Sequence, residues 1–161
     1  MELRPAGPDE LDRVGEVTLA AYEEFLVGPH DPYRARLRDA AARAREAELW
    51  VAADGAELLG CVTYCPPGSP WRELAATARE GEFRMLAVHP AARGRGVGEA
   101  LAGLCEERAR RHGATTMVLS SLAEMTAAHR VYGRLGYTRL PGRDWSPMPD
   151  VHLIAFVKEL P

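Results

Sequence analysis

The residues best placed to do chemistry lie in a glycine-rich loop, where Gly94, Gly96 and Gly98 alternate with other residues. The apolar segment EFRMLAV precedes this loop, and residues 97–112 follow it with helical periodicity. Glycine adopts backbone conformations that side chains forbid, and it lets another group approach the main chain closely. The start of a helix presents unpaired N–H groups and about half a positive charge. The loop therefore predicts an anion site, most simply a site for a phosphate.

Two common nucleotide motifs do not fit this loop. A P-loop needs Gly-Lys followed by Ser or Thr, which GRGVGEA lacks. A dinucleotide-binding fold has its glycines as G-x-G-x-x-G directly after the strand, whereas here the spacing is G-x-G-x-G and HPAAR intervenes. A strand-to-helix turn whose glycines serve geometry alone stays open as an alternative, although Arg93 and Arg95 beside the glycines favour an anion.

Two segments together resemble the GNAT superfamily of acyltransferases. LAVHPAARGRGVGEAL is similar to the coenzyme A motif of that family, (Arg/Gln)-x-x-Gly-x-(Gly/Ala). AAHRVYGRLGYTRL is similar to its A-x-x-x-Y-x-x-x-G-(F/Y) signature. The matching residues are Arg93, Gly96 and Gly98 in the first segment and Ala128, Tyr132, Gly136 and Tyr137 in the second. The resemblance covers residues 45–140 well, and the first 45 residues match only in helical layout.

The resemblance implies an acetyl-coenzyme A (acetyl-CoA)-dependent N-acetyltransferase with one GNAT domain over residues 1–161. The implied fold is α/β (α+β), with a mixed, mostly antiparallel sheet that splays at the cofactor cleft and about four flanking helices. The strand 82–88 would pair with the pantetheine arm, and the loop N–H groups would hold the diphosphate. The residues implied in cofactor binding are Leu86, Ala87, Val88, Arg93, Gly94, Arg95, Gly96, Val97, Gly98 and Glu99.

Two residues are predicted to move protons. The attacking amine must be neutral, and a lysine-like ammonium with a pKa of about 10.4 opposes this by about 4.6 kcal/mol at pH 7. Glu82 is the candidate general base, because it lies four residues before Leu86 and is expected on the same face of the strand. Histone-type family members, which this segment resembles, have a catalytic glutamate at the corresponding position. The alternatives are a solvated Glu82 carboxylate and proton loss to water.

Tyr132 aligns with the tyrosine that many family members use as a general acid toward the departing thiolate; the alternative is a core aromatic. Ser120 stands where many relatives have a glutamate, which shifts weight to Glu82 as the base. Met125 stands where many have an asparagine, so one polar contact to coenzyme A or to the acceptor is expected to be missing or supplied by another residue. The acceptor is expected to be a small-molecule, peptide or protein amine. Candidate residues for its pocket are Tyr22, Phe25, Trp71, Trp145, Asp31 and Asp150.

Hydrophobic periodicity predicts the elements that position these residues. Helices are expected at residues 8–25, 31–47, 97–112 and 126–135. Strands are expected at LWVAAD, ELLGCVTYC, EFRMLAV, TMVLS and VHLIAFVK. Asp54-Gly55 is a good tight-turn pair and joins the first two strands into a hairpin. The helix at 31–47 is thinly apolar and is expected on the surface, and residues 71–81 form either a loop or a short helix.

Composition limits the class of protein. A chain of 161 residues with 47% hydrophobic residues fits one globular domain. The net charge of -3 does not favour nucleic acid or an anionic membrane. No segment approaches the roughly 18 apolar residues of a membrane span, and MELRPAGPDELDRV lacks a signal-type core, so a cytoplasmic location is expected.

The three cysteines fall in apolar strand and helix sequence and are expected to be buried thiols. No paired Cys-x-x-Cys occurs, which argues against a metal-binding role. No metal site is expected. A homodimer is an expectation from the family alone. Two other functions stay open: a non-catalytic sensor or scaffold that binds coenzyme A, and a different nucleotide-dependent enzyme.

Overall fold

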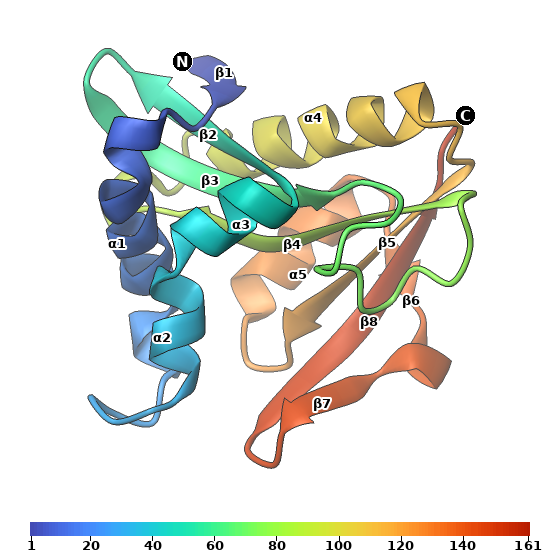
Figure 1. Cartoon of the computed structure of the whole chain (residues 1–161). Coiled ribbons are helices and arrows are strands. Elements are labelled where there is room, and N and C mark those ends of the chain that lie inside the picture. The colour runs from blue at the N-terminus through green and yellow to red at the C-terminus, as the bar shows by residue number, and fades with distance from the viewer.

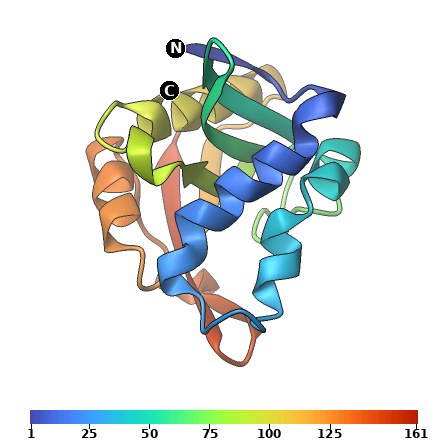
Figure 2. The ribbon, with the colours of Figure 1, turned by 90° about the vertical axis from the view of Figure 1, so that its left-hand side faces the viewer.

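The computed structural model describes residues 1–161. The chain forms a mixed β-sheet that is covered by helices on both faces (Figures 1 and 2). The strands are β1 (Glu2–Pro5), β2 (Glu48–Asp54), β3 (Glu57–Cys65), β4 (Glu80–Val88), β5 (Thr116–Leu122), β6 (Thr138–Arg139), β7 (Trp145–Met148) and β8 (Val151–Glu159). The helices are α1 (Leu11–Tyr22), α2 (Tyr33–Arg38), α3 (Ala40–Glu46), α4 (Val97–Arg111) and α5 (Thr126–Arg134). The predicted α/β class is confirmed.

The sheet runs in the order β1-β2-β3-β4-β5-β8-β6, and β7 pairs with β8. Only β4 and β5 are parallel to each other. Helices α1 to α3 cover one face, and α4 and α5 cover the other (Figure 2). The core therefore has two halves, which we call the α1–α3 half and the α4–α5 half. Because both faces are covered, β3 is buried along almost its whole length.

The parallel strands β4 and β5 separate part-way along their length. Their last paired residues are Phe83 and Leu119, yet β4 continues to Val88 and β5 to Leu122. Beyond Phe83, β4 is paired with β3 on its other side only. One edge of a central strand is thus left without a strand partner.

The main-chain donors on this free edge can be identified. The N–H of His89 donates to the carbonyl of Leu59 in β3, at 2.8 Å. Because N–H directions alternate along a strand, the N–H groups of Leu86 and Val88 point away from β3. They are therefore available to another extended chain laid along β4.

A β-bulge at Met85 interrupts β4. Met85 is the one residue other than glycine with a positive φ, at 50°. Thr63 pairs with Arg84 and Cys61 pairs with Ala87, so β4 holds one residue more than β3 between these two pairs. A positive φ is strained for a side chain of this kind, and such strain is common beside functional sites.

The bulge overturns the expectation that Glu82 and Leu86 share a face. Counting in steps of two holds only for a regular strand. Phe83 packs in the α4–α5 half of the core and Leu86 packs against the same half, although the two residues are three positions apart, an odd number. Glu82, the neighbour of Phe83, therefore points to the opposite face from Leu86.

The other differences from the sequence expectations are local. The helix expected at 31–47 is two helices, α2 and α3, which meet at Asp39. The Asp39 carboxylate accepts the N–H of Ala42 at 3.0 Å and caps α3, so this side chain competes with a continuous helix. The expected surface position is wrong in part, because Leu37 and Arg43 are fully buried. Residues 71–79 form a loop, and the short strands β1, β6 and β7 were not predicted.

The close approach of α1 to the end of α2 gives a stability test. A Cβ added to Gly15 would lie 2.3 Å from the carbonyl oxygen of Arg38. We expect Gly15→Ala to lower the free energy of unfolding by about 1–3 kcal/mol, as overpacking does. Gly103 in α4 has open space around it, so Gly103→Ala should raise stability by about 0.5–1 kcal/mol. Urea denaturation of both variants measures this, and a Gly15→Ala protein as stable as the wild type would contradict the packing described.

Candidate active site

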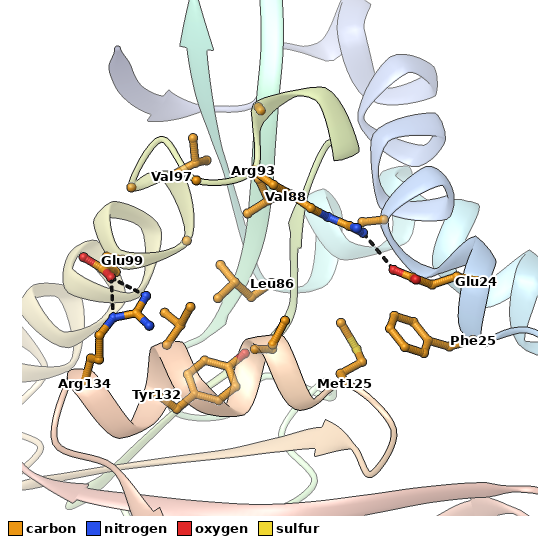
Figure 3. Close-up of a pocket in the computed structure, with 18 residues that line it drawn as sticks. Glu24, Phe25, Leu86, Val88, Arg93, Val97, Glu99, Met125, Tyr132 and Arg134 are labelled. Atoms are coloured by element: carbon orange, nitrogen blue, oxygen red, sulfur yellow. Dashed lines mark hydrogen bonds and ion pairs between the residues drawn. The ribbon is translucent and has the colours of Figure 1, made fainter.

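A cavity of about 480 Å³ opens beside the free edge of β4 (Figure 3). Its walls come from β4, the glycine loop with the first turn of α4, the face of α5 and the end of α1. The predicted residues that line it are Leu86, Val88, Arg93, Gly94, Gly96, Val97, Gly98, Glu99 and Tyr132. Phe25, a candidate for the acceptor pocket, also lines it. The lining residues that were not predicted as site residues are Ala21, Glu24, Ala92, Met125, Ala127, Ala128, Val131 and Arg134.

The glycine loop forms a row of unpaired main-chain donors. The N–H groups of residues 94–99 donate no hydrogen bond within the protein, and the first N–H of α4 to do so is that of Ala100, to the Gly96 carbonyl at 3.0 Å. Gly94 and Gly96 have φ values of 77° and 76°, which side chains rarely adopt. No side chain caps the start of α4. The row can therefore bind an anion, assisted by the positive end of the helix dipole.

Three of the predicted site residues do not line this cavity. Ala87 is 1% exposed and faces the α1–α3 half of the core. Arg95 is absent from the lining and lies 3.6 Å from Asp54, at the end of β2. Glu82 is fully buried away from the cavity. The side chain of Ala87 therefore takes no part in the cavity, and only its main chain lies on this strand.

Two ion pairs flank the row of donors (Figure 3). Arg93 contacts Glu24 at 3.1 Å, and Arg134 contacts Glu99 at 2.8 Å. All four side chains are more than 40% exposed, so each pair contributes little to stability. Both arginines can therefore turn toward a more highly charged anion at small cost.

Tyr132 presents its hydroxyl to the same cavity. The ring rises from α5 with the oxygen on the side of Leu86 (Figure 3). The residue is 4% exposed, and its hydroxyl makes no hydrogen bond within the protein. Burial raises the pKa of Tyr132 well above the usual value for a tyrosine, and the nearby Cys105 adds to this. The phenol is thus a protonated, unoccupied donor at neutral pH.

Glu82 has a different environment from the one that was predicted. Its carboxylate accepts the main-chain N–H groups of Glu73 at 3.1 Å, Leu74 at 2.9 Å and Ala75 at 2.9 Å. The pKa of Glu82 is raised, because the effect of burial exceeds the lowering by these hydrogen bonds and by Arg84. The carboxylate fastens the loop 71–79 onto β4.

A second cavity, of about 630 Å³, lies between the α1–α2 connection and the turn from β7 to β8. Phe25 lines both cavities, so the two are neighbours. Three carboxylates line the second cavity: Asp31, Glu124 and Asp150. Of the residues predicted for an acceptor pocket, Phe25, Asp31 and Asp150 line it, and Tyr22, Trp71 and Trp145 line neither cavity.

Comparison with known sequences identifies the class of protein. Residues 15–137 match the model of the acetyltransferase (GNAT) family. A mycothiol acetyltransferase of Cellulomonas flavigena is 36% identical over 118 residues, which are 68% of this chain and 34% of that protein. A mycothiol acetyltransferase of Geodermatophilus obscurus is 36% identical over 106 residues, which are 60% of this chain and 33% of that protein. The chain spans about a third of the length of these curated relatives.

Solved structures share the fold at low sequence identity. A putative acetyltransferase of Salmonella typhimurium, yncA, solved with acetyl-CoA, has a TM-score of 0.69 at 21% identity and covers 100% of this chain and 94% of its own. An aminoglycoside 6′-N-acetyltransferase complexed with coenzyme A has a TM-score of 0.72 at 17% identity, over 100% of this chain and 98% of its own. The match of residues 15–137 to the family model shows that the chain belongs to the acetyltransferase (GNAT) family, so the predicted family is confirmed, and the solved structures confirm the predicted fold.

The burial of tyrosines predicts how the protein responds to alkali. The pKa is raised, mainly by burial, for all five tyrosines, and for Tyr64 it reaches about 12. Tyrosines of the unfolded chain ionise near pH 10. Their ionisation should therefore leave the free energy of unfolding unchanged below that pH and lower it as the pH rises above it. Phenolate absorbance should therefore appear together with unfolding, and Tyr132→Phe should reduce its amplitude by one residue. Ionisation of a tyrosine near pH 10 in the folded state would contradict this burial.

Proposed function

We propose that the chain is an N-acetyltransferase that transfers the acetyl group of acetyl-CoA to a primary amine while both substrates are bound. The observation that carries this proposal is the row of unpaired N–H groups at residues 94–99, next to the free edge of β4. The row offers donors to a diphosphate. The edge offers strand-like partners to the amides of the pantetheine arm. Family membership supplies the reaction class and makes acetyl-CoA the expected donor.

The residues of the cavity fit the reacting end of this donor. Bound acetyl-CoA supplies an activated thioester carbonyl and a thiolate leaving group. The N–H of Leu86 points to the open edge, where it can donate to the carbonyl oxygen as negative charge develops there. The Tyr132 hydroxyl, free of other partners, can deliver its proton to the departing sulfur.

The amine would enter through the second cavity, which adjoins the first at Phe25. Its proton must be removed, and the general-base role of Glu82 stays a prediction. The geometry supports a positioning role for Glu82 instead, because its carboxylate accepts three main-chain donors and lines neither cavity. In that case the amine loses its proton to solvent. The alternative function, a coenzyme A-binding sensor without turnover, is favoured only by the absence of Glu82 from both cavities.

The cellular setting is part of the proposal. No helix of the chain is long and apolar enough to cross a bilayer. Cys61, Cys65 and Cys105 are free and buried, which suits the reducing cytoplasm that we propose as the location. A homodimer remains an expectation from the family.

The role of the glycine loop can be tested by binding. Gly96→Ala forces a side chain into a left-handed conformation at the row of donors, which is unfavourable by about 1–2 kcal/mol and disturbs the N–H directions. We expect acetyl-CoA to bind this variant at least about tenfold more weakly by titration calorimetry. Gly113→Ala is the matched control, since Gly113 has a φ of 82° at the other end of α4 and open space around it. Unchanged binding by Gly96→Ala, or equal losses in both variants, would contradict the proposal.

The two candidate catalytic residues can be separated by kinetics. Tyr132→Phe keeps the packing and removes the proton donor, so kcat should fall about 100-fold with little change in KM. We expect Glu82→Gln to keep the pH dependence of kcat/KM and to lower stability, because an amide nitrogen would face the N–H of Glu73. Loss of the acidic limb of the pH profile in Glu82→Gln would instead establish Glu82 as the base. A Tyr132→Phe enzyme with full turnover would exclude the acid role.

A further inference from the structure

The second cavity carries an unbalanced negative charge. The carboxylates of Asp31, Glu124 and Asp150 line it, and no lysine or arginine does. The one other ionisable group of the lining, apart from the phenol of Tyr33, is the imidazole of His30. A hollow lined by charges of one sign concentrates ligands of the opposite sign. The lining therefore favours a cationic ligand.

The arginines of α2, the helix that begins at this cavity, do not compensate that charge. Each of them contacts a carboxylate outside the cavity: Arg34 contacts Glu23 at 2.8 Å, Arg36 contacts Glu73 at 3.9 Å, and Arg38 contacts Glu16 at 3.2 Å. None of these six side chains lines the second cavity. The negative charge of the lining is thus left for a ligand to balance.

Two of the three carboxylates have no partner within the protein. Glu124 lies between β5 and α5, Asp150 lies in the β7–β8 turn, and both side chains are exposed and make neither a hydrogen bond nor an ion pair. Asp31 differs, because its carboxylate accepts the main-chain N–H groups of Val27 at 3.0 Å and Tyr33 at 2.9 Å. Asp31 thus shapes the α1–α2 connection, whereas Glu124 and Asp150 are free to bind a ligand.

A buried hydroxyl of the same cavity is also without a partner. Tyr33 lines the second cavity and is 4% exposed, yet its hydroxyl makes no hydrogen bond within the protein. The enclosed side-chain nitrogens and oxygens without a partner are those of Arg36, Arg43 and Trp145, so the Tyr33 oxygen is not enclosed and opens to the cavity. A phenol oxygen accepts a hydrogen bond from an ammonium group. Tyr33 is therefore a second, independent sign of a polar ligand.

The second cavity adjoins the first along two segments of the chain. Phe25 lines both cavities, and on the β5–α5 connection Met125 lines the first whereas its neighbour Glu124 lines the second. Figure 3 shows Phe25 and Met125 on the same side of the first cavity, away from Arg134. Consecutive Cα atoms lie about 3.8 Å apart, so Glu124 stands close to this boundary. A molecule with its amine in the first cavity can therefore extend into the second.

The rest of the second cavity is suited to an aliphatic chain. Leu26, Leu122, Met148 and Val151 line it, and so does Val27, a large hydrophobic residue that is 84% exposed. The volume of about 630 Å³ lies in the range of pockets that hold a whole small molecule. An apolar spacer between two charged ends matches this distribution of apolar and acidic groups.

We propose that the acceptor is an aliphatic amine with a second ammonium group, which Glu124 and Asp150 bind in the second cavity. This inference rests on the proposed function and specifies the substrate class of the same site. The second ammonium group donates to the two free carboxylates and to the Tyr33 hydroxyl. At the other end the neutral amine forms a bond to the acetyl carbon and the carbon–sulfur bond breaks. The nitrogen gives up one proton and the sulfur receives one, so the step is balanced.

The test compares amines that differ only in the second charge. α,ω-Diaminoalkanes and amino alcohols of the same chain length are measured for binding by calorimetry in the presence of coenzyme A, and for turnover with acetyl-CoA. After correction for its two equivalent amines, the best diamine should exceed its amino alcohol about tenfold or more in affinity and in kcat/KM, which is the size of a charge-assisted hydrogen bond. This excess should shrink as the salt concentration rises, because salt screens exposed charges.

A pair of double variants separates recognition at the cavity from the overall charge. Glu124→Gln with Asp150→Asn removes the two free carboxylates and no contact of the fold, and it should lower kcat/KM for the diamines to that for the amino alcohols. Asp12→Asn with Glu57→Gln is the matched control, because both residues are exposed, unpaired and outside both cavities. It removes the same amount of charge and should keep the preference for diamines.

The outcomes distinguish this inference from the proposed function. Equal binding and turnover of diamines and amino alcohols by the wild type, binding of neither, or an equal loss of the preference in both double variants would overturn the inference. Transfer to a lysine-containing peptide in preference to every diamine would also overturn it and would assign the cavity to a peptide. Absence of transfer from acetyl-CoA to any amine would instead reject the proposed function, because the binding of diamines is measured separately.

Discussion

The structure depends on the separation of β4 from β5 after Phe83 and Leu119. A central strand normally has hydrogen-bonding partners on both edges, because unpaired main-chain groups away from water are unfavourable. Here the protein leaves one edge of β4 free and builds a cavity beside it, between that edge and α5. The glycine loop begins where this edge ends, so strand-like donors and helix-start donors follow one another along the wall of the same cavity. A ligand with amides at one end and phosphates at the other is complementary to that order.

The bulge at Met85 decides which residues face which cavity. Leu86 and Val88 face the proposed donor site, and Met85 and Ala87 belong to the opposite half of the core. Arg84 and Glu82 lie on that opposite side as well, where each has a distinct partner: Arg84 the two tryptophan rings and Glu82 the loop 71–79. Glu82 fixes the loop that carries Trp71, and the guanidinium group of Arg84 lies over the ring of Trp71, so one strand lines the donor cavity on one face and holds this loop on the other. The positive φ of Met85 accompanies the bulge that shifts these side chains from one face of the strand to the other.

The sequence predicted the elements with strong periodicity and the residues that act through their main chain. The glycine loop is signalled by residues that tolerate a positive φ, and the start of α4 and Tyr132 are signalled by spacing on a helix. Both signals are local in the sequence and do not depend on distant contacts. The orientation of Glu82 was missed because a bulge is set by pairing between strands and leaves no periodic trace. The break at Asp39 and the buried Arg43 were missed because α2 and α3 pack on α1, which a single helix pattern cannot show.

The most direct measurement of the central claim is amide hydrogen exchange with and without acetyl-CoA. The free edge and the loop should change together, because one ligand accepts from both. We predict that acetyl-CoA slows exchange at Leu86, at Val88 and at residues 94–99, while amides of β2, whose partners are other strands, exchange as before. Saturating acetyl-CoA that left the amides of this edge and loop unprotected would contradict the account.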